Sequence, residues 1–126
     1  MGFLDRLKAS TSATNQAWKT LSSIDQLDQI DVQSNERPVI LFKHSTTCGI
    51  SAGAKYRLED AWGDEVKNYD FYYLDLLTYR PISNAIATRY GVRHESPQIL
   101  VIQNGKAVYN ASHQRIDLAR IEQAIG

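Results

Sequence analysis

The sequence predicts an α/β fold in which a mixed β-sheet carries helices on both faces. Three features predict it: apolar runs of strand length alternate with helical patterns, residues 39–42 form a continuous apolar run, and Asn104-Gly105 separates two late strand candidates. Alternating strands and helices favour parallel pairing through crossover helices. A short run without a polar side indicates a strand buried on both faces. An Asn-Gly pair is a strong signal for a two-residue hairpin turn.

The chain has 126 residues, which is enough for one domain with a hydrophobic core. Residues 1–16 are mostly small and polar and are expected to form a mobile leader, so the domain is expected to span residues 17–126. Fourteen basic and fourteen acidic residues cancel, which gives no electrostatic reason to expect nucleic acid or an anionic membrane as partner. No secretion signal and no membrane-spanning run is present in the sequence. We therefore expect a cytoplasmic protein whose partners are small molecules or other proteins.

Nine elements are expected along the chain. They are strands over 18–21, 39–42, 70–76, 98–103 and 106–109, and helices over 23–35, 48–62, 81–90 and 116–125. Ser23 is a suitable N-cap for the first helix, Pro81 suits the first position of the third helix, and Gly91 suits its end. The first strands should pair in parallel and the last two as an antiparallel hairpin. This mixed sheet with helices on both faces is the thioredoxin architecture.

The helix over 48–62 is expected to begin just after the central strand. Polar residues 43–48 suit a loop and a helix cap between the two elements. Lys43 and His44 in this loop would add positive charge near the helix start. The apolar stripe expected to pack on the sheet consists of Ile50, Ala54, Leu58, Ala61 and Trp62.

Cys48 is the only cysteine in the chain, which excludes an internal disulfide and an internal dithiol. It follows the central strand and opens the next helix, where ligands of open α/β sheets collect. Thr47 can cap that helix, and the free N–H groups and helix dipole favour a thiolate at Cys48. Cys48 is therefore the predicted nucleophile. The alternative is an inert, buried small hydrophobe, but its neighbours are polar or tiny.

Ser51 stands three residues after Cys48, where a dithiol enzyme would have a resolving cysteine. A serine can only hydrogen-bond the thiolate, so an outside thiol must resolve any mixed disulfide. The alternative for Ser51 is an exposed polar position on the helix. No metal site is predicted, because His44, His94 and His113 are widely separated and the chain has one thiol.

Pro97 stands directly before the strand that should lie beside the strand leading to Cys48. Thioredoxin folds place a cis-proline at this point. Ser96 would then expose its backbone N–H and C=O, and an extended substrate could pair with them as a short added strand. Ser96 and Pro97 are therefore the candidate substrate-binding residues. The alternative is a trans proline that only starts a strand.

Two motifs carry a family resemblance. The run FKHSTTCGIS at residues 42–51, together with HESPQ at residues 94–98, resembles the monothiol bacilliredoxins of the YtxJ type. The resemblance covers roughly residues 18–125. It implies a thioredoxin-like fold, no tightly bound cofactor, and removal of bacillithiol from S-bacillithiolated proteins. Cys48 matches the family's reactive cysteine and Pro97 its cis-proline, whereas Gly49 departs from the proline or serine expected there.

The residues and the resemblance together predict a thiol-disulfide oxidoreductase. The Cys48 thiolate would attack the mixed disulfide of a client protein, release the protein thiol and retain the small thiol. A second low-molecular-weight thiol, such as bacillithiol, or a reductase would then restore Cys48. The alternative is a non-catalytic thioredoxin-fold binding or stress-response module whose single cysteine is only modified.

Overall fold

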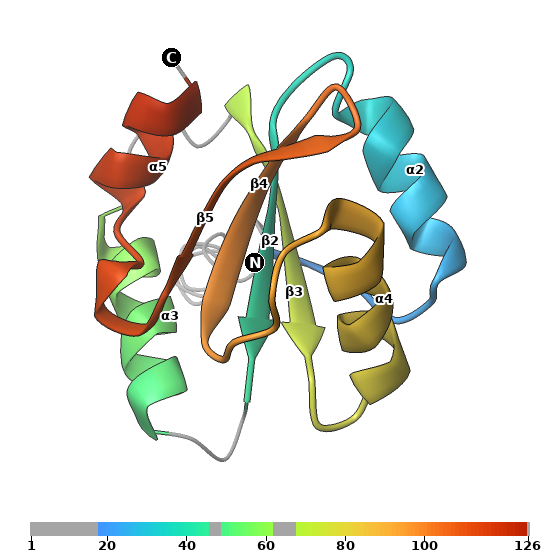
Figure 1. Ribbon diagram of the computed structural model, residues 1–126. Coiled ribbons are helices and arrows are strands. Elements are labelled where there is room, and N and C mark those ends of the chain that lie inside the picture. The colour runs from blue at the N-terminus through green and yellow to red at the C-terminus, as the bar shows by residue number, and fades with distance from the viewer. Residues whose placement is uncertain (1–17, 46–48, 62–67, 126) are drawn as a thin grey trace, which may run out of the picture.

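The described part of the chain forms a five-stranded sheet with two helices on each face (Figure 1). The computed structural model describes residues 18–45, 49–61 and 68–125. Its strands are β1 (Trp18–Thr20), β2 (Val39–His44), β3 (Asp70–Asp75), β4 (Gln98–Gln103) and β5 (Lys106–Ser112). Its helices are α2 (Asp25–Gln33), α3 (Gly49–Asp60), α4 (Arg80–Tyr90) and α5 (Leu118–Ile125), with a 3₁₀ turn, η2 (His113–Arg115), before α5. The expected leader lies outside the described residues, so the domain boundary at residue 17 stays a prediction.

The sheet has the strand order β1-β3-β2-β4-β5. The first three strands are parallel, whereas β4 runs antiparallel to β2 and β5 antiparallel to β4. This confirms the predicted mixed sheet. Because of these directions, β2, β3 and β5 end, and β4 starts, at the same end of the sheet. We call this end of the sheet, where the parallel strands terminate, the site edge.

Strand β2 is the centre of the hydrophobic core and is buried on both faces, as predicted. Val39 and Leu41 pack in a cluster with apolar side chains of α2 and α4. Ile40 and Phe42 pack in a second cluster with side chains of α3 and α5. Burying one such side chain fully contributes about 1.5–3 kcal/mol relative to leaving it exposed. Figure 1 shows the same division, with α2 and α4 on one face and α3 and α5 on the other.

The loop expected after Phe42 is wrong at its first two residues. Lys43 and His44 continue β2 as paired strand residues, and both side chains are buried. The strand continues because β3 and β4 flank it on both sides, with Lys43 opposite Leu74 and Gln98. The backbone ladder is therefore complete, and the polar side chains are left to find partners on the two faces of the sheet.

Helix α3 occupies the position predicted for it. Ala54 and Leu58 are buried as expected, but Ala61 is exposed and lies just beyond the end of the helix at Asp60. The side chains of Ile50 and Trp62 lie outside the described residues. Trp18 of the edge strand β1 contacts the last turn of α3, since its indole Nε1 donates a 2.8 Å hydrogen bond to Glu59.

Several other boundaries differ from the prediction, most of them by one or two residues. Strand β5 runs to Ser112 rather than residue 109, because its last residues still pair with the start of β4. Helix α5 starts at Leu118 rather than residue 116, because η2 takes up the preceding turn. Ser23 does not cap α2: Ile24 is at the N-cap, and the Gln26 side chain instead accepts hydrogen bonds from backbone N–H groups just before the helix.

The two predicted glycine positions are confirmed. Gly91 ends α4 with a φ of 66°, and Asn104-Gly105 forms the β4–β5 hairpin turn with φ values of 53° and 74°. Such positive values strain most side chains and favour glycine and asparagine. Across the described ranges, no helix combines the length and apolar character that crossing a membrane requires.

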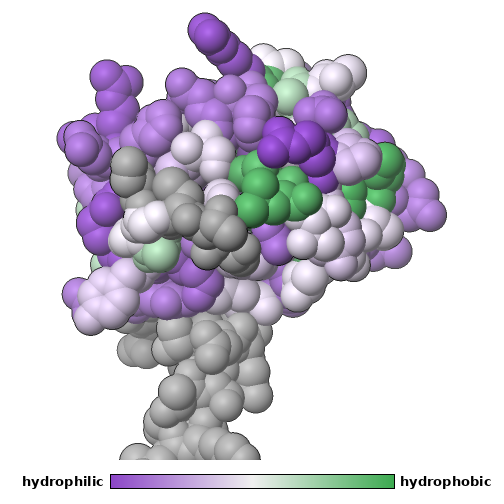
Figure 2. Space-filling view, turned by 90° about the horizontal axis from the view of Figure 1, so that it is seen from below, coloured by the Kyte–Doolittle hydropathy of each residue, from purple (hydrophilic) through white to green (hydrophobic). Residues whose placement is uncertain are grey.

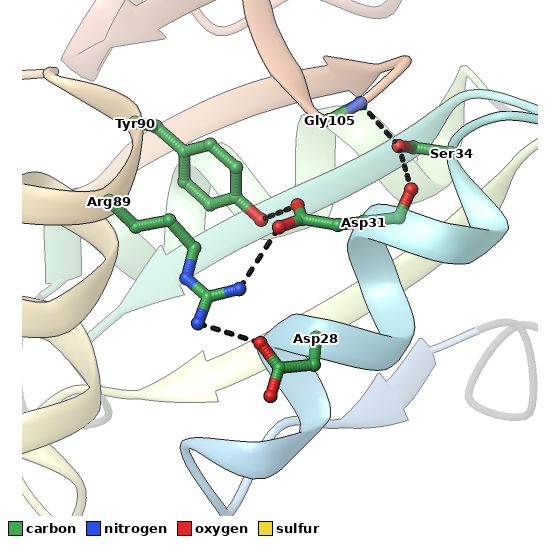
Figure 3. A network of polar contacts seen from close by, with 6 residues as sticks. All are labelled: Asp28, Asp31, Ser34, Arg89, Tyr90 and Gly105. Carbon is green, nitrogen blue, oxygen red and sulfur yellow. Dashed lines mark hydrogen bonds and ion pairs between the residues drawn. The ribbon is translucent and has the colours of Figure 1, made fainter.

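A polar network ties α2, α4 and the hairpin together at the sheet edge opposite the site edge (Figure 3). Tyr90 donates a 2.6 Å hydrogen bond to Asp31, and Arg89 bridges Asp28 and Asp31 at 2.9 and 3.0 Å. The Ser34 hydroxyl accepts a hydrogen bond from the Gly105 N–H at 2.9 Å. Burial is the largest cause that raises the pKa of Tyr90, and the hydrogen bond to Asp31 adds to it.

Candidate functional site

The predicted site residues gather at the site edge as far as the structure describes them. Cys48 and Thr47 lie outside the described residues, immediately before Gly49, the first residue of α3. The ladder pairs Lys43 with Gln98, so residues 44–45 and 96–97 come to the same end of neighbouring strands. Ser96 and Pro97, which directly precede β4, are thus brought beside the strand that leads to Cys48.

The Ser96–Pro97 peptide bond is cis, as predicted. Pro97 is buried and Ser96 is half-buried. The carbonyl of Pro97 accepts a 3.1 Å hydrogen bond from the N–H of His113, which connects this segment to η2. We call residues 92–97 the proline loop. Whether Ser96 offers its backbone to a substrate stays a prediction.

On the α4 side of the sheet, a buried lysine holds the proline loop. Lys43 is 0 % exposed, and its ammonium donates to Nδ1 of His94 at 3.3 Å. The Ser83 hydroxyl of α4 lies 3.2 Å from the same nitrogen. An ammonium group can only donate, so Nδ1 of His94 must be an acceptor and the ring proton must be on Nε2. The lysine therefore selects one tautomer of His94.

The electrostatics of this pair are unusual for a protein interior. Within the described ranges Lys43 has no carboxylate partner, although a fully buried lysine normally has one. Burial lowers its pKa from the ordinary 10.5 to about 8. Burial also lowers the pKa of His94, and the charges of Lys43 and Arg80 lower it further. At neutral pH the pair consists of a lysine cation and a neutral histidine.

Gln98 completes the α4-side group. Its side chain is 1 % exposed and its Nε2 donates to the carbonyl of Arg93 at 2.9 Å, inside the proline loop. Its Oε1 is buried and accepts no hydrogen bond from any residue that the structure describes. Counting only partners among the described residues, this face of the site edge has unused donors on Lys43 and an unused acceptor on Gln98.

On the α3 side of the sheet, His44 and Ser51 form the corresponding polar pair. Ser51 is 0 % exposed, which rules out the alternative of an exposed helix position. Its hydroxyl oxygen accepts a 3.0 Å hydrogen bond from the N–H of Ser45 and lies 2.5 Å from Nδ1 of His44. The imidazole of His44 packs between the rings of Phe42 and Tyr73, with centroids 5.5 and 5.2 Å away.

The charge state of His44 follows from its surroundings. Burial is the largest cause that lowers its pKa, and the nearby Lys55 lowers it further, while Asp75 acts in the opposite direction. His44 is therefore neutral at neutral pH. The positive charge that the sequence suggested at residues 43 and 44 comes from Lys43 alone.

Sequence reasoning missed His94, Ser83 and Gln98 as parts of the site. The motif at residues 94–98 contained His94 and Gln98, but nothing in it pointed to a buried lysine as their neighbour. Ser83 lies on a helix in a polar segment, and no sequence pattern pointed to it as part of the site.

Seen from the site edge, the surface is mostly hydrophilic, with a small hydrophobic patch near its centre (Figure 2).

Comparison with known proteins supplies the family. The family model described as "Monothiol bacilliredoxin BrxC" matches residues 19–121 of the chain. The chain belongs to this family. Among solved structures, this bacilliredoxin is similar to a protein described as a candidate oxidoreductase with a thioredoxin fold, with 35% identity and a TM-score of 0.75. That alignment covers 88% of this chain and 96% of the other.

Two thioredoxins show the same fold at lower identity. Thioredoxin f from spinach chloroplast has a TM-score of 0.68 at 16% identity, over 86% of this chain and 87% of its own. Thioredoxin from Fasciola hepatica has a TM-score of 0.64 at 18% identity, over 85% and 95%. The thioredoxin-like fold of this bacilliredoxin is thus confirmed.

Gly49 is the position where the resemblance predicted proline or serine. The residue is exposed, and a Cβ built on it would meet no described atom within 4 Å. Glycine is therefore not required there by space. A proline would also suit the first turn of α3, where its missing N–H leaves no helix hydrogen bond broken.

Proposed function

We propose that this bacilliredoxin removes a low-molecular-weight thiol, bacillithiol by family, from S-thiolated client proteins in the cytoplasm. The observation that carries the proposal is the family match over residues 19–121, which spans the lone Cys48. The Cys48 thiolate attacks the small-thiol sulfur of the client's mixed disulfide. A new disulfide forms between Cys48 and the small thiol, and the client sulfur leaves as a thiolate.

The second half of the cycle needs an outside thiol, because no other sulfur nucleophile of the cysteine type exists in the chain. A second bacillithiol thiolate attacks the small-thiol sulfur bound to Cys48. This releases a symmetrical bacillithiol disulfide and returns Cys48 as a thiolate. No tightly bound cofactor is needed for either step.

Thr47 and Ser51 are proposed to stabilise the thiolate. Thr47 would act through the helix start, and Ser51 through its hydroxyl proton. Ser51 has only one such proton, and its oxygen already contacts Nδ1 of His44. Ser51 can donate to a thiolate only if His44 carries its proton on Nδ1 and donates to Ser51. The role of Ser51 thus depends on the tautomer of His44.

Ser96 and Pro97 are proposed to bind the client protein as an added strand. The proline loop is held from three directions, which supports a fixed docking edge. Lys43 contacts His94, Gln98 contacts the carbonyl of Arg93, and His113 contacts the carbonyl of Pro97. A backbone edge that is already ordered loses less conformational entropy when a peptide pairs with it.

The test is removal of bacillithiol from a bacillithiolated model protein, followed by mass spectrometry. Wild type with excess bacillithiol should turn over many equivalents, whereas Cys48→Ser and the protein alkylated at Cys48 should release none. Retained activity in Cys48→Ser would overturn the proposal. A single adduct on Cys48 with no further turnover would instead indicate a binding or stress-response module whose cysteine is only modified.

A further inference from the structure

A cavity of about 730 Å³ lies where the proline loop, the end of β5, η2 and α5 meet. The side chains that give it its chemical character are Glu95, His113, Arg115 and Arg120. Small-molecule sites usually have volumes of about 300–1,000 Å³, so the cavity has the size for a small ligand. Nothing in the function proposed above uses it.

The charged groups of the cavity favour an anion. Arg115 and Arg120 are permanently cationic and exposed to the cavity opening. Arg120 has one ion pair among the described residues, a long 3.8 Å contact with the exposed Asp117. Glu95 is the only carboxylate among the described lining residues, and its pKa is lowered first by a hydrogen bond with Ser112 and then by the nearby His113, Arg93 and Arg115. Guanidinium groups recognise carboxylates through paired hydrogen bonds.

The backbone of η2 fixes this cavity beside the proline loop. His113 has a φ of 56°, a conformation that side-chain-bearing residues rarely adopt and that clusters at functional sites. Its N–H binds the carbonyl of Pro97 at 3.1 Å. Its own carbonyl accepts a 3.0 Å hydrogen bond from Arg57 of α3. Residue 113 thus joins the candidate docking loop to the helix that Cys48 precedes.

We propose that this cavity binds the carboxylates of a low-molecular-weight thiol through Arg115 and Arg120. The inference rests on the proposed function, which requires such a thiol to be held on Cys48 and then released. Bacillithiol and glutathione both carry carboxylates, so both belong to the class that the cavity fits. A thiol without a carboxylate, such as cysteamine, does not belong to it.

The binding test uses S-methyl bacillithiol, which has no free thiol and cannot react with Cys48. Its affinity is measured by NMR titration for wild type, Arg115→Gln, Arg120→Gln and Lys106→Gln. We expect each arginine variant to bind about tenfold more weakly, as for loss of one charge-assisted hydrogen bond. Lys106→Gln is the control for net charge, since Lys106 is exposed at the opposite sheet edge. Glu95→Gln should bind more tightly, because it removes the one carboxylate among the described lining residues.

The chemical class is tested with S-methyl glutathione and S-methyl cysteamine in the same titrations. The first should bind at the cavity and the second should not. Equal affinity of wild type and both arginine variants for S-methyl bacillithiol, or shifts confined to other regions, would overturn the inference. These results are independent of turnover. Bacillithiol removal that is unaffected in both arginine variants would overturn the inference and leave the proposed function standing. Binding of S-methyl bacillithiol at the cavity, with no removal of bacillithiol by wild type, would support the cavity as a binding site and overturn the proposed function.

Discussion

The two faces of β2 carry different polar groups at the site edge. On the α4 side, Lys43 and Ser83 both contact Nδ1 of His94, Oε1 of Gln98 accepts no hydrogen bond from a described residue, and the buried charge of Lys43 has no counter-charge among the described residues. On the α3 side, Ser51 and His44 are both neutral. The Ser51 hydroxyl contacts Nδ1 of His44 and accepts a hydrogen bond from the N–H of Ser45. The α4 side is thus held at an electrostatic cost, whereas the α3 side is held by a simple hydrogen-bond chain.

This difference separates two tasks that the site must perform. The α4-side group fastens the proline loop, where a client protein is proposed to dock. The α3-side group fastens the start of α3, which directly follows Cys48 in the chain. Perturbing one side should therefore leave the other largely intact, and each side should have its own pH dependence.

The largest expected effect comes from removing the buried charge with Lys43→Met. The lysine titrates at about 8 in the folded protein and at 10.5 when unfolded. Between these values the unfolded state binds more protons, so Lys43 makes the free energy of unfolding rise with pH, by about 3 kcal/mol over this window. We measure the free energy of unfolding of both proteins by urea unfolding from pH 7 to 10.5. The wild-type value minus the variant value should rise by about 3 kcal/mol over this window.

Lys106→Met is the control for the loss of one positive charge, because Lys106 is exposed. Tyrosine ionisation contributes equally to wild type and variant and cancels in the subtraction. A flat difference for Lys43→Met would mean that the lysine is hydrated in solution, and the asymmetry between the two faces would disappear.

The next effect compares one serine from each side. Ser51→Ala leaves the N–H of Ser45 and Nδ1 of His44 without this partner, which should lower the free energy of unfolding by about 1–3 kcal/mol. Ser83→Ala should change it by less than about 1 kcal/mol, because Lys43 still donates to His94. Chemical unfolding of both variants at pH 7 measures this. Equal losses would contradict the proposed difference between the faces.

A smaller effect concerns His94 and acid. Its pKa is lowered in the fold, so the unfolded state takes up the proton first, and stability falls as the pH drops below the ordinary value of 6.5. The protonated ring cannot accept from Lys43 and faces Arg80 as a second cation, with Glu95 as the opposing charge. His94→Asn keeps an acceptor but cannot titrate. We expect it to flatten part of the stability profile between pH 5 and 7.

Burial also lowers the pKa of His44, so His44 contributes a slope of the same sign below the ordinary value of 6.5. His94→Leu is the matched variant that removes both the acceptor and the titration. At pH 7.5 it should lower the rate of small-thiol transfer from protein substrates a few-fold more than His94→Asn does. Equal rates for the two variants would show that the contact with Lys43 does not hold the proline loop.

The last prediction concerns the tautomer of His44, which spectroscopy reports without any change in stability. If Ser51 donates its proton to the Cys48 thiolate, His44 must carry its own proton on Nδ1 at neutral pH. Nitrogen-15 NMR of the imidazole distinguishes the two tautomers directly. A protonated Nε2 with an unprotonated Nδ1 would mean that Ser51 donates to His44 instead, and thiolate stabilisation would then be assigned to Thr47 and the helix start.

The sequence predicted those features that depend on local residue types. The apolar run in β2, the hairpin at Asn104-Gly105, the end of α4 at Gly91 and the cis bond at Pro97 each follow from a few adjacent residues. The interior polar groups could not be predicted in this way. Lys43 and its partner His94 are 51 residues apart, and neighbouring residues alone indicate a loop where a polar residue follows an apolar run.

The site itself could be predicted only in outline. Cys48, Thr47, Ser51, Ser96 and Pro97 were chosen from motif spacing, and spacing does not show which groups share a proton. The burial of Ser51 depends on the course of α3 over the sheet and on His44 beneath it. That arrangement is a property of packing between elements.

The contact between Trp18 and α3 makes the protein its own optical probe. The indole packs on Phe42 and Phe71 with centroids 5.5 Å away and donates to Glu59 of α3. The chain has two tryptophans, so Trp62→Phe leaves Trp18 as the sole tryptophan, which can be excited selectively over tyrosine. Indole emission depends on its hydrogen bond and its exposure to water. Stopped-flow fluorescence of this variant would therefore follow any displacement of α3 as a disulfide forms and breaks at Cys48, without a label attached to the chain.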